Sequence, residues 1–431
     1  MPADAERGKH IIAAAKSLKS KPLADSNIAH YLYATSFAGR GGLFASALRH
    51  AGQISLDRAQ ILAEAEGFTR LDVRDRLLPW LERSNLVYVR LRQDKTIDSI
   101  ESLVLTYEPL LTAVAEFYDS LDPTPEDRGC VQALAIASAL PTPQSEVTHA
   151  VASNVGEEAA RRAVELAKNY HIVAYKAGKG LREPVLYAER IWTKFNAKAA
   201  QSLTPLKNDD RAALLALVSK VQQHQGVPES LVQADAKKNG AEHMLSLGIG
   251  IGLLNRTQIQ MADGARRSFL TTPHFYSDMG DEFGDDMCDR VKIFLDSIRN
   301  GQHFGRLGTG KVLFPGRLLQ KLLNTGEIGP CTAIGTDYVT SERAGIVRVR
   351  RPAGRTVRSS VLELVQRDTV QKVHDIITTG SMITSTQMTP GDVAEGVRFA
   401  SIEQLRADAA EQPEPVAEAE RAIMQKLRES V

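Results

Sequence analysis

The stretch 335–365, GTDYVTSERAGIVRVRRPAGRTVRSSVLELV, gives the clearest structural signal in the chain. Residues 336–344 are typical of one or two turns of helix, which Gly345 ends. Apolar residues alternate with arginines over 346–350, as in a strand, and 356–365 has the pattern of a returning strand. The proline and the glycine between them are typical of a tight turn. The sequence therefore predicts a short helix followed by a two-stranded hairpin.

This hairpin segment is rich in arginine and contains no acidic residue between Glu342 and Glu363. Because alternate residues of a strand share a face, we expect Arg348 and Arg350 to project together. Guanidinium groups bind phosphates bidentately and fit a narrow minor groove. We therefore interpret the hairpin as a nucleic-acid contact; the alternatives are a solvated basic hairpin and one that docks on an acidic protein surface. The arginines of the segment are Arg343, Arg348, Arg350, Arg351, Arg355 and Arg358.

Length and composition indicate a folded protein of several domains. A chain of 431 residues is long enough for roughly two to four domains. Its 43% hydrophobic and 24% charged residues are ordinary for a folded globular protein. The formal net charge is only +1, so any nucleic-acid surface must be a local patch. This counts against a protein that coats DNA without specificity.

Cysteine usage and hydropathy predict a cytoplasmic protein. The three cysteines Cys130, Cys288 and Cys331 are far apart and form no C-x-x-C pair, which argues against a disulfide scaffold and a zinc ribbon. The sequence has no apolar run as long as a membrane span, and MPADAERGKH at its start has no signal-peptide core.

The order helix, helix, strand, turn, strand recurs along the chain. In its first occurrence, Ser55 caps a helix, a second helix contains Pro79 and is expected to kink or break there, and LVYVRLR forms a strand. Upstream, the cluster Gly39-Arg40-Gly41-Gly42 is interpreted as a hinge between two helices. The last occurrence begins with a helix over 290–300 and uses 317–323 as its second helix, with an insertion, 301–315, between the two. The predicted organisation is an N-terminal helical region (1–52), four modules (53–121, 126–200, 208–276 and 287–378) and a flexible acidic tail (379–431).

This order resembles the winged helix-turn-helix superfamily, with several modules in tandem over residues 53–372. The resemblance implies a mainly α fold with small β-hairpins, an α+β class, and identifies no particular family. In winged-helix proteins the third helix enters the major groove, and the hairpin, or wing, contacts the backbone or the minor groove. Carried over to this chain, the wing would use residues 348–358 on phosphates, and the helix would present to base edges Thr336, Asp337, Tyr338, Thr340 and Arg343.

Two acids in that helix, Asp337 and Glu342, imply that the wing supplies most of the affinity and the helix some selectivity. The wings of the other modules carry fewer basic residues. The resemblance places on them Lys176, Lys179, Arg266 and Arg267.

GRLGTGKV at 305–312 nearly matches the phosphate-binding loop G-x-x-x-x-G-K-[ST]. Gly305, Gly310 and Lys311 fit, but Val312 stands where a hydroxyl should hold magnesium. Such a loop also follows a buried strand and opens a helix, and the flanking sequence here predicts neither. We therefore expect a connector, or a basic glycine loop beside DNA.

No motif predicts catalysis, a cofactor or a metal. The acidic run 278–289 lacks the glycine and glutamate positions of a calcium loop, so an acidic linker is the better interpretation. We find no H-E-x-x-H and no G-x-S-x-G motif. The protein is expected to be a non-enzyme.

Three hypotheses follow. The first is a protein that binds double-stranded DNA through tandem winged helices, as a prokaryotic transcription regulator. The second is a non-enzymatic scaffold whose winged helices bind a protein partner or a second copy of the chain. The third is an NTP-dependent enzyme that uses residues 305–311.

Overall fold

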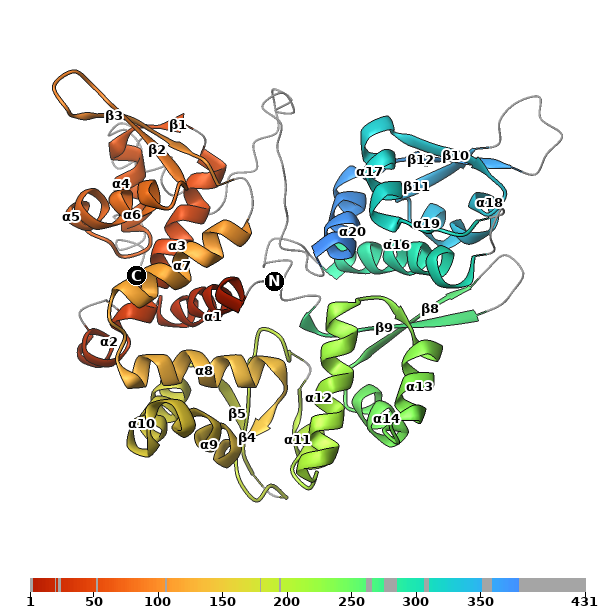
Figure 1. Cartoon of the computed structure of the whole chain (residues 1–431), viewed down its shortest axis with the longest axis horizontal. Helices are drawn as coiled ribbons and strands as arrows, with labels where there is room; N and C mark the ends of the chain where they lie inside the picture. The colour runs from red at the N-terminus through yellow and green to blue at the C-terminus, as the bar shows by residue number, and fades with distance from the viewer. Residues whose placement is uncertain are drawn as a thin grey trace, which may run out of the picture. The chain divides into compact units, whose positions relative to one another are not determined.

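The computed structural model of the chain describes residues 3–19, 21, 25–51, 53–104, 107–178, 180–193, 195–260, 266–274, 285–305, 310–350 and 359–379 (Figure 1). The chain is mainly helical, and the strands among these residues form four antiparallel sheets of three strands each. It divides into two compact units, one that reaches Asp127 and one that begins at Arg128. The predicted mainly α class with small antiparallel β elements is confirmed.

The first unit is a helical layer joined to one small sheet. Helix α1 packs against both α3 and α7. The elements are α1 (Ala3–Leu18), α2 (Ser26–Tyr31), α3 (Tyr33–Ala51), β1 (Gln53–Ile54), α4 (Leu56–Glu64), α5 (Arg70–Asp72), the π-helix η1 (Val73–Leu77), α6 (Leu78–Arg83), β2 (Val87–Leu91), β3 (Ile97–Ser102) and α7 (Tyr107–Ser120).

The hinge that we predicted at the glycine cluster is wrong, because α3 continues through it as one helix. A Cβ on Gly39 would lie 2.3 Å from the Cβ of Ala15, and a Cβ on Gly42 would lie 2.8 Å from a methyl group of Val114. The glycines therefore let α1 and α7 approach α3 closely. Arg40 between them is buried and donates hydrogen bonds to the carbonyls of Leu18 and Lys21.

The Ser55 cap that we predicted in this unit is confirmed, whereas the second helix does not break at Pro79 and instead changes to a π-helix just before it. The Ser55 hydroxyl accepts from the amide of Arg58 at the start of α4. Thr69 and Asp72 form a capping box at the start of α5. Pro79 lies in the first turn of α6, directly after the π-helix, so the widened turn accommodates a residue that has no N–H to donate.

The second unit contains three further sheets and the helices around them. Its elements are α8 (Pro125–Ala139, which begins just before the boundary), β4 (Thr142–Pro143), α9 (Gln144–Val155), α10 (Glu157–Asn169), β5 (Ala174–Lys176), β6 (Val185–Tyr187), α11 (Ala197–Leu203), α12 (Asn208–Gln223), β7 (Val227–Pro228), α13 (Glu229–Lys238), α14 (Glu242–Gly250), β8 (Asn255–Gln260), β9 (Arg266–Thr271), α16 (Asp285–Phe304), α17 (Pro315–Thr325), β10 (Glu327–Cys331), α18 (Ile334–Asp337), α19 (Val339–Arg343), β11 (Val347–Arg350), β12 (Ser360–Leu364) and α20 (Arg367–Thr379).

One order of elements occurs four times: a helix, a short strand, one or more helices, and two further strands. In every sheet the last strand lies between the other two. We call these repeats modules 1 to 4, residues 33–102, 125–187, 208–271 and 315–364. The first strand of each sheet was not predicted from the sequence. Each predicted two-stranded hairpin is therefore part of a three-stranded sheet.

The four modules also share the turn that leads into the hairpin. The second residue after the last helix has a positive φ in each module, and the residue that follows it donates to the carbonyl five positions before itself, as in a Schellman cap. The stop predicted at Gly345, where φ is 70°, is confirmed. The donor and acceptor pairs are Leu86 and Leu81, Ile172 and Ala167, Leu253 and Gly248, and Ile346 and Ser341, with N to O distances of 2.8, 2.8, 2.8 and 3.1 Å.

Module 4 begins later than we predicted. Strand β10 follows α17 directly, so α17 holds the place of the first helix, where we expected the second. Helix α16 precedes the module and contacts β7 and β8 as well as α17, α18, α19 and α20 (Figure 1). Its residues Phe294, Leu295 and Ile298 are fully buried in the core of module 4. Helix α16 therefore belongs to the cores of two modules.

Candidate nucleic-acid interface

The arginines of β11 lie on one exposed face of the module 4 sheet, as the alternation predicted. Arg348 is directly opposite Glu363 on β12, and Glu363 in turn is opposite Glu327 on β10. The Arg350 guanidinium donates to both carboxylates, with an Nη2 to Oε2 distance of 3.1 Å to Glu327. Hydrogen bonding to Glu363 raises the pKa of Arg350. The positive charges of two arginines on this face are thus balanced by the negative charges of two glutamates.

Tyr338 requires a correction, because its side chain is only 4% exposed. The predicted helix is two short helices, and Tyr338 is the residue between them. Its ring enters the core against Phe294, with 6.3 Å between ring centroids, and burial raises the pKa of its hydroxyl. Tyr338 therefore holds the helix pair on the core and does not reach a base edge.

The other predicted residues of this segment lie nearer the surface. Arg343 is exposed at the end of α19, and Thr340 is half-buried. Thr336 is exposed, and its hydroxyl donates to the Asp337 carboxylate at 2.9 Å. Arg351, Arg355, Arg358 and, in module 2, Lys179 lie outside the described residues, so their roles stay predictions.

On the wing of module 3, Arg266 is exposed, whereas Arg267 is half-buried and contacts other residues of the protein. Arg267 donates to the Asn300 side chain, and its guanidinium lies 4.4 Å from the centroid of the Phe304 ring. In module 2, Lys176 is half-buried, with its ammonium 5.8 Å from the centroid of the Tyr187 ring. Arg267 and Lys176 thus have structural contacts that the sequence did not indicate.

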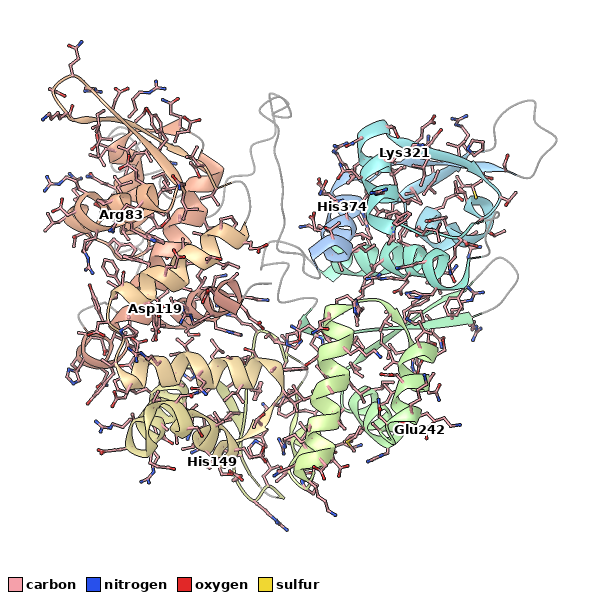
Figure 2. All side chains as sticks on the ribbon, viewed as in Figure 1. Arg83, Asp119, His149, Glu242, Lys321 and His374 are labelled. Carbon is pink, nitrogen blue, oxygen red and sulfur yellow. The ribbon has the colours of Figure 1, made fainter. Side chains whose placement is uncertain are left out.

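Two of the helices that precede the other hairpins, α10 and α14, carry no net positive charge. On α10, Arg162 pairs with Glu158 at 2.7 Å and Lys168 with Glu165 at 3.0 Å. Helix α14 has no arginine or lysine, and the exposed residue at its start is Glu242 (Figure 2). These faces therefore provide little net positive charge for a phosphate backbone.

GRLGTGKV does not have the setting of a phosphate-binding loop, because helix α16 precedes it where a strand is required. Its glycines have a packing role instead. A Cβ on Gly305 would lie 2.5 Å from the carbonyl oxygen of Gly301, and a Cβ on Gly310 would lie 2.2 Å from the Cβ of Ala333. The amide of Val312 also donates to the Gly301 carbonyl at 3.0 Å, so the segment after the loop is fixed on the last turn of α16.

The acidic run 278–289 lies outside the described side chains except for Asp289. Among the cysteines whose side chains are described, Cys130 and Cys331 form no disulfide bond. Comparison with protein-family models, curated proteins and solved structures gives no match in any of the three. None of the helices that the structure describes combines the length and apolar character needed to span a membrane.

Proposed function

We propose that this protein binds double-stranded DNA through tandem winged helices, and that the wing of module 4 makes the main phosphate contacts. The fourfold repetition of helix, strand, helices and hairpin supports the winged-helix interpretation, because it includes a third strand at the place where a winged helix has one. As part of the same proposal, the protein acts as a transcription regulator in a prokaryotic cytoplasm.

The observation that carries this proposal is the acid-free arginine segment from Arg343 to Arg358. Its described members Arg343 and Arg348 are exposed and form no ion pair with any described residue. Arg350, in contrast, would have to leave two carboxylates before it could bind phosphate. We therefore assign the contact to Arg348 and the arginines that follow Arg350.

The test is fluorescence anisotropy of a random-sequence duplex with the full chain at two salt concentrations. Each lost phosphate contact lowers the salt slope by about 0.9. Replacing Arg351, Arg355 and Arg358 together by alanine should therefore flatten the slope by about 2 to 3. Arg350→Ala is the matched control and should change the slope much less. No binding by the wild type at low salt would refute the proposal.

A scaffold function is the second candidate, and the balanced charge on α10 and on the module 4 sheet favours it. Paired charges contribute little to phosphate binding but can specify a protein partner. In that case a co-purifying protein, or a second copy of the chain, should stay bound in salt that abolishes DNA binding. Sedimentation of the purified protein in low and high salt separates the two candidates.

A further inference from the structure

The C-terminal half of α16 contains a buried cation that forms no ion pair with any described residue. Arg299 is 8% exposed, and its Nε donates to the carbonyl of Gln225 at 3.2 Å. One terminal nitrogen donates to the Gln302 side chain at 2.7 Å. Both partners are neutral. Since a guanidinium has five N–H groups, further donors are left for a ligand.

Three other basic side chains gather at this position. Lys311 donates to the carbonyl of His303 at 3.4 Å, and both side chains are half-buried. His224 directly precedes Gln225, whose carbonyl Arg299 binds. Hydrogen bonds therefore connect the end of α12, the end of α16 and the segment before α17.

The electrostatic potential at this cluster is positive. Burial lowers the pKa of His303, and the positive charges of Arg299, Lys311 and His224 lower it further. Burial also lowers the pKa of Arg299. Over the part of the chain that the structure describes, no Asp or Glu forms an ion pair with any of these four residues. Residues 297–326, which include three of them, contain no acidic residue at all.

A structural role explains only part of this arrangement. Cations near the C-terminus of a helix interact favourably with its dipole, which accounts for Lys311 at the His303 carbonyl. It does not account for Arg299, because its guanidinium binds a carbonyl from a different segment. A buried charge is stabilised by a compensating charge, and the two acceptors of this guanidinium are neutral.

We propose that Arg299, His303, Lys311 and His224 form a binding site for a phosphate-type oxyanion, which supplies the counter-ion that Arg299 does not find among the described residues. Arg299 provides the buried end of the site, and Lys311 and His303 provide its entrance. The close packing of Gly301, Gly305 and Val312 holds Lys311 in place. The site is separate from the wing, so it does not depend on the function proposed above.

The primary test uses the full chain with labelled histidine, followed by NMR, and inorganic phosphate and pyrophosphate as probes. His303, assigned with the variant His303→Gln, should shift during the titration, and its pKa should rise because an anion stabilises the imidazolium. Lys311→Gln should weaken binding by about tenfold or more, the effect of one lost hydrogen bond to a charged group. Lys321→Gln on α17 (Figure 2) is the matched control, because Lys321 is an exposed lysine of the same acid-free stretch, and it should leave the affinity unchanged.

Two results would overturn the site. One is the absence of any His303 shift with either probe. The other is an equal shift with sodium chloride at the same ionic strength, which would show screening alone. Lys311→Gln should have the melting temperature of the wild type in the absence of phosphate, so that lost binding is not lost folding.

A competition experiment then distinguishes the source of the phosphate. If pyrophosphate weakens binding of duplex DNA to the wild type but not to Lys311→Gln, the site takes a backbone phosphate. If DNA binding is indifferent to pyrophosphate, the site takes a small phosphate compound. The variant with three wing arginines replaced should still bind phosphate, so failure of the wing proposal and failure of this one give different results.

Discussion

Asp296 should make the local stability of α16 depend on pH. It is 1% exposed and accepts a hydrogen bond from the Thr257 hydroxyl of β8 at 2.6 Å, while its Oδ1 has no hydrogen-bond partner. Burial is the main cause that raises its pKa from 3.8 to about 7, against the bond from Thr257 and the charge of Lys292. The change to make is Asp296→Asn, which keeps an acceptor for Thr257 and cannot ionise.

The sign and size follow from linkage. Because the pKa is higher in the folded state, folding favours the protonated acid, and stability is lost as the pH rises towards the folded pKa of about 7. The loss takes place between pH 5 and the folded pKa, an interval of about two pH units. At about 1.4 kcal/mol per unit, the wild type should therefore lose about 3 kcal/mol of local stability between pH 5 and pH 8. The variant should lose none by this route.

Hydrogen exchange of peptides from α16, corrected for the intrinsic rate, measures this local opening free energy. From pH 5 to pH 8, protection in the wild type should fall by about a hundredfold relative to protection in Asp296→Asn. The lowered pKa of His303 on the same helix makes stability rise with pH in both proteins, so the comparison between the two isolates Asp296. Among the described carboxyls, Asp127 also has a strongly raised pKa, and it belongs to the first unit.

Asp289→Asn is the control. Asp289 lies on the same helix, and its side chain is 69% exposed. It should keep the pH dependence of the wild type. Equal pH dependence in the wild type and in Asp296→Asn would refute the reasoning, since Asp296 would then not hold the proton.

Three further substitutions test the packing, each by calorimetric melting. Gly310→Ala should destabilise the protein by about 1–3 kcal/mol, because its new Cβ would lie 2.2 Å from the Cβ of Ala333. Gly250→Ala should stabilise it by about 0.5–1 kcal/mol, because this helical glycine has open space around it; a loss of stability there would contradict the packing description. Asp127→Ala should cost about 1–3 kcal/mol, because the carboxylate accepts from the amides of Ala34 and Thr35 at the buried start of α3; an unchanged melting temperature would show that these amides find other acceptors.

Local sequence patterns predicted the elements whose signal is local. The glycine after α19, the alternation of β11 and the serine cap of α4 each depend on a few adjacent residues, and all three were found. Strands such as Thr142–Pro143 and Val227–Pro228 have two residues, which is too short for a period of two to be visible, and only pairing with a distant strand defines them.

The candidate interface depends more on distant residues, which is why sequence analysis described it less well. Arg350 is neutralised by residues 13 and 23 positions away, and strand register alone brings them together. The residues around Tyr338 have the composition of a surface helix. Its burial follows from the break between α18 and α19. The absence of acids over 297–326, in contrast, was visible in the sequence and points to the cluster around Arg299.

Helix α16 has a consequence for how the chain can be divided. One face contacts module 3, where Asp296 bonds to Thr257 of β8 and Asn300 to Arg267 of β9, and another contributes Phe294 to the core of module 4. A fragment cut on either side of this helix would expose apolar surface that the intact chain buries. Modules 3 and 4 should therefore melt as one cooperative block.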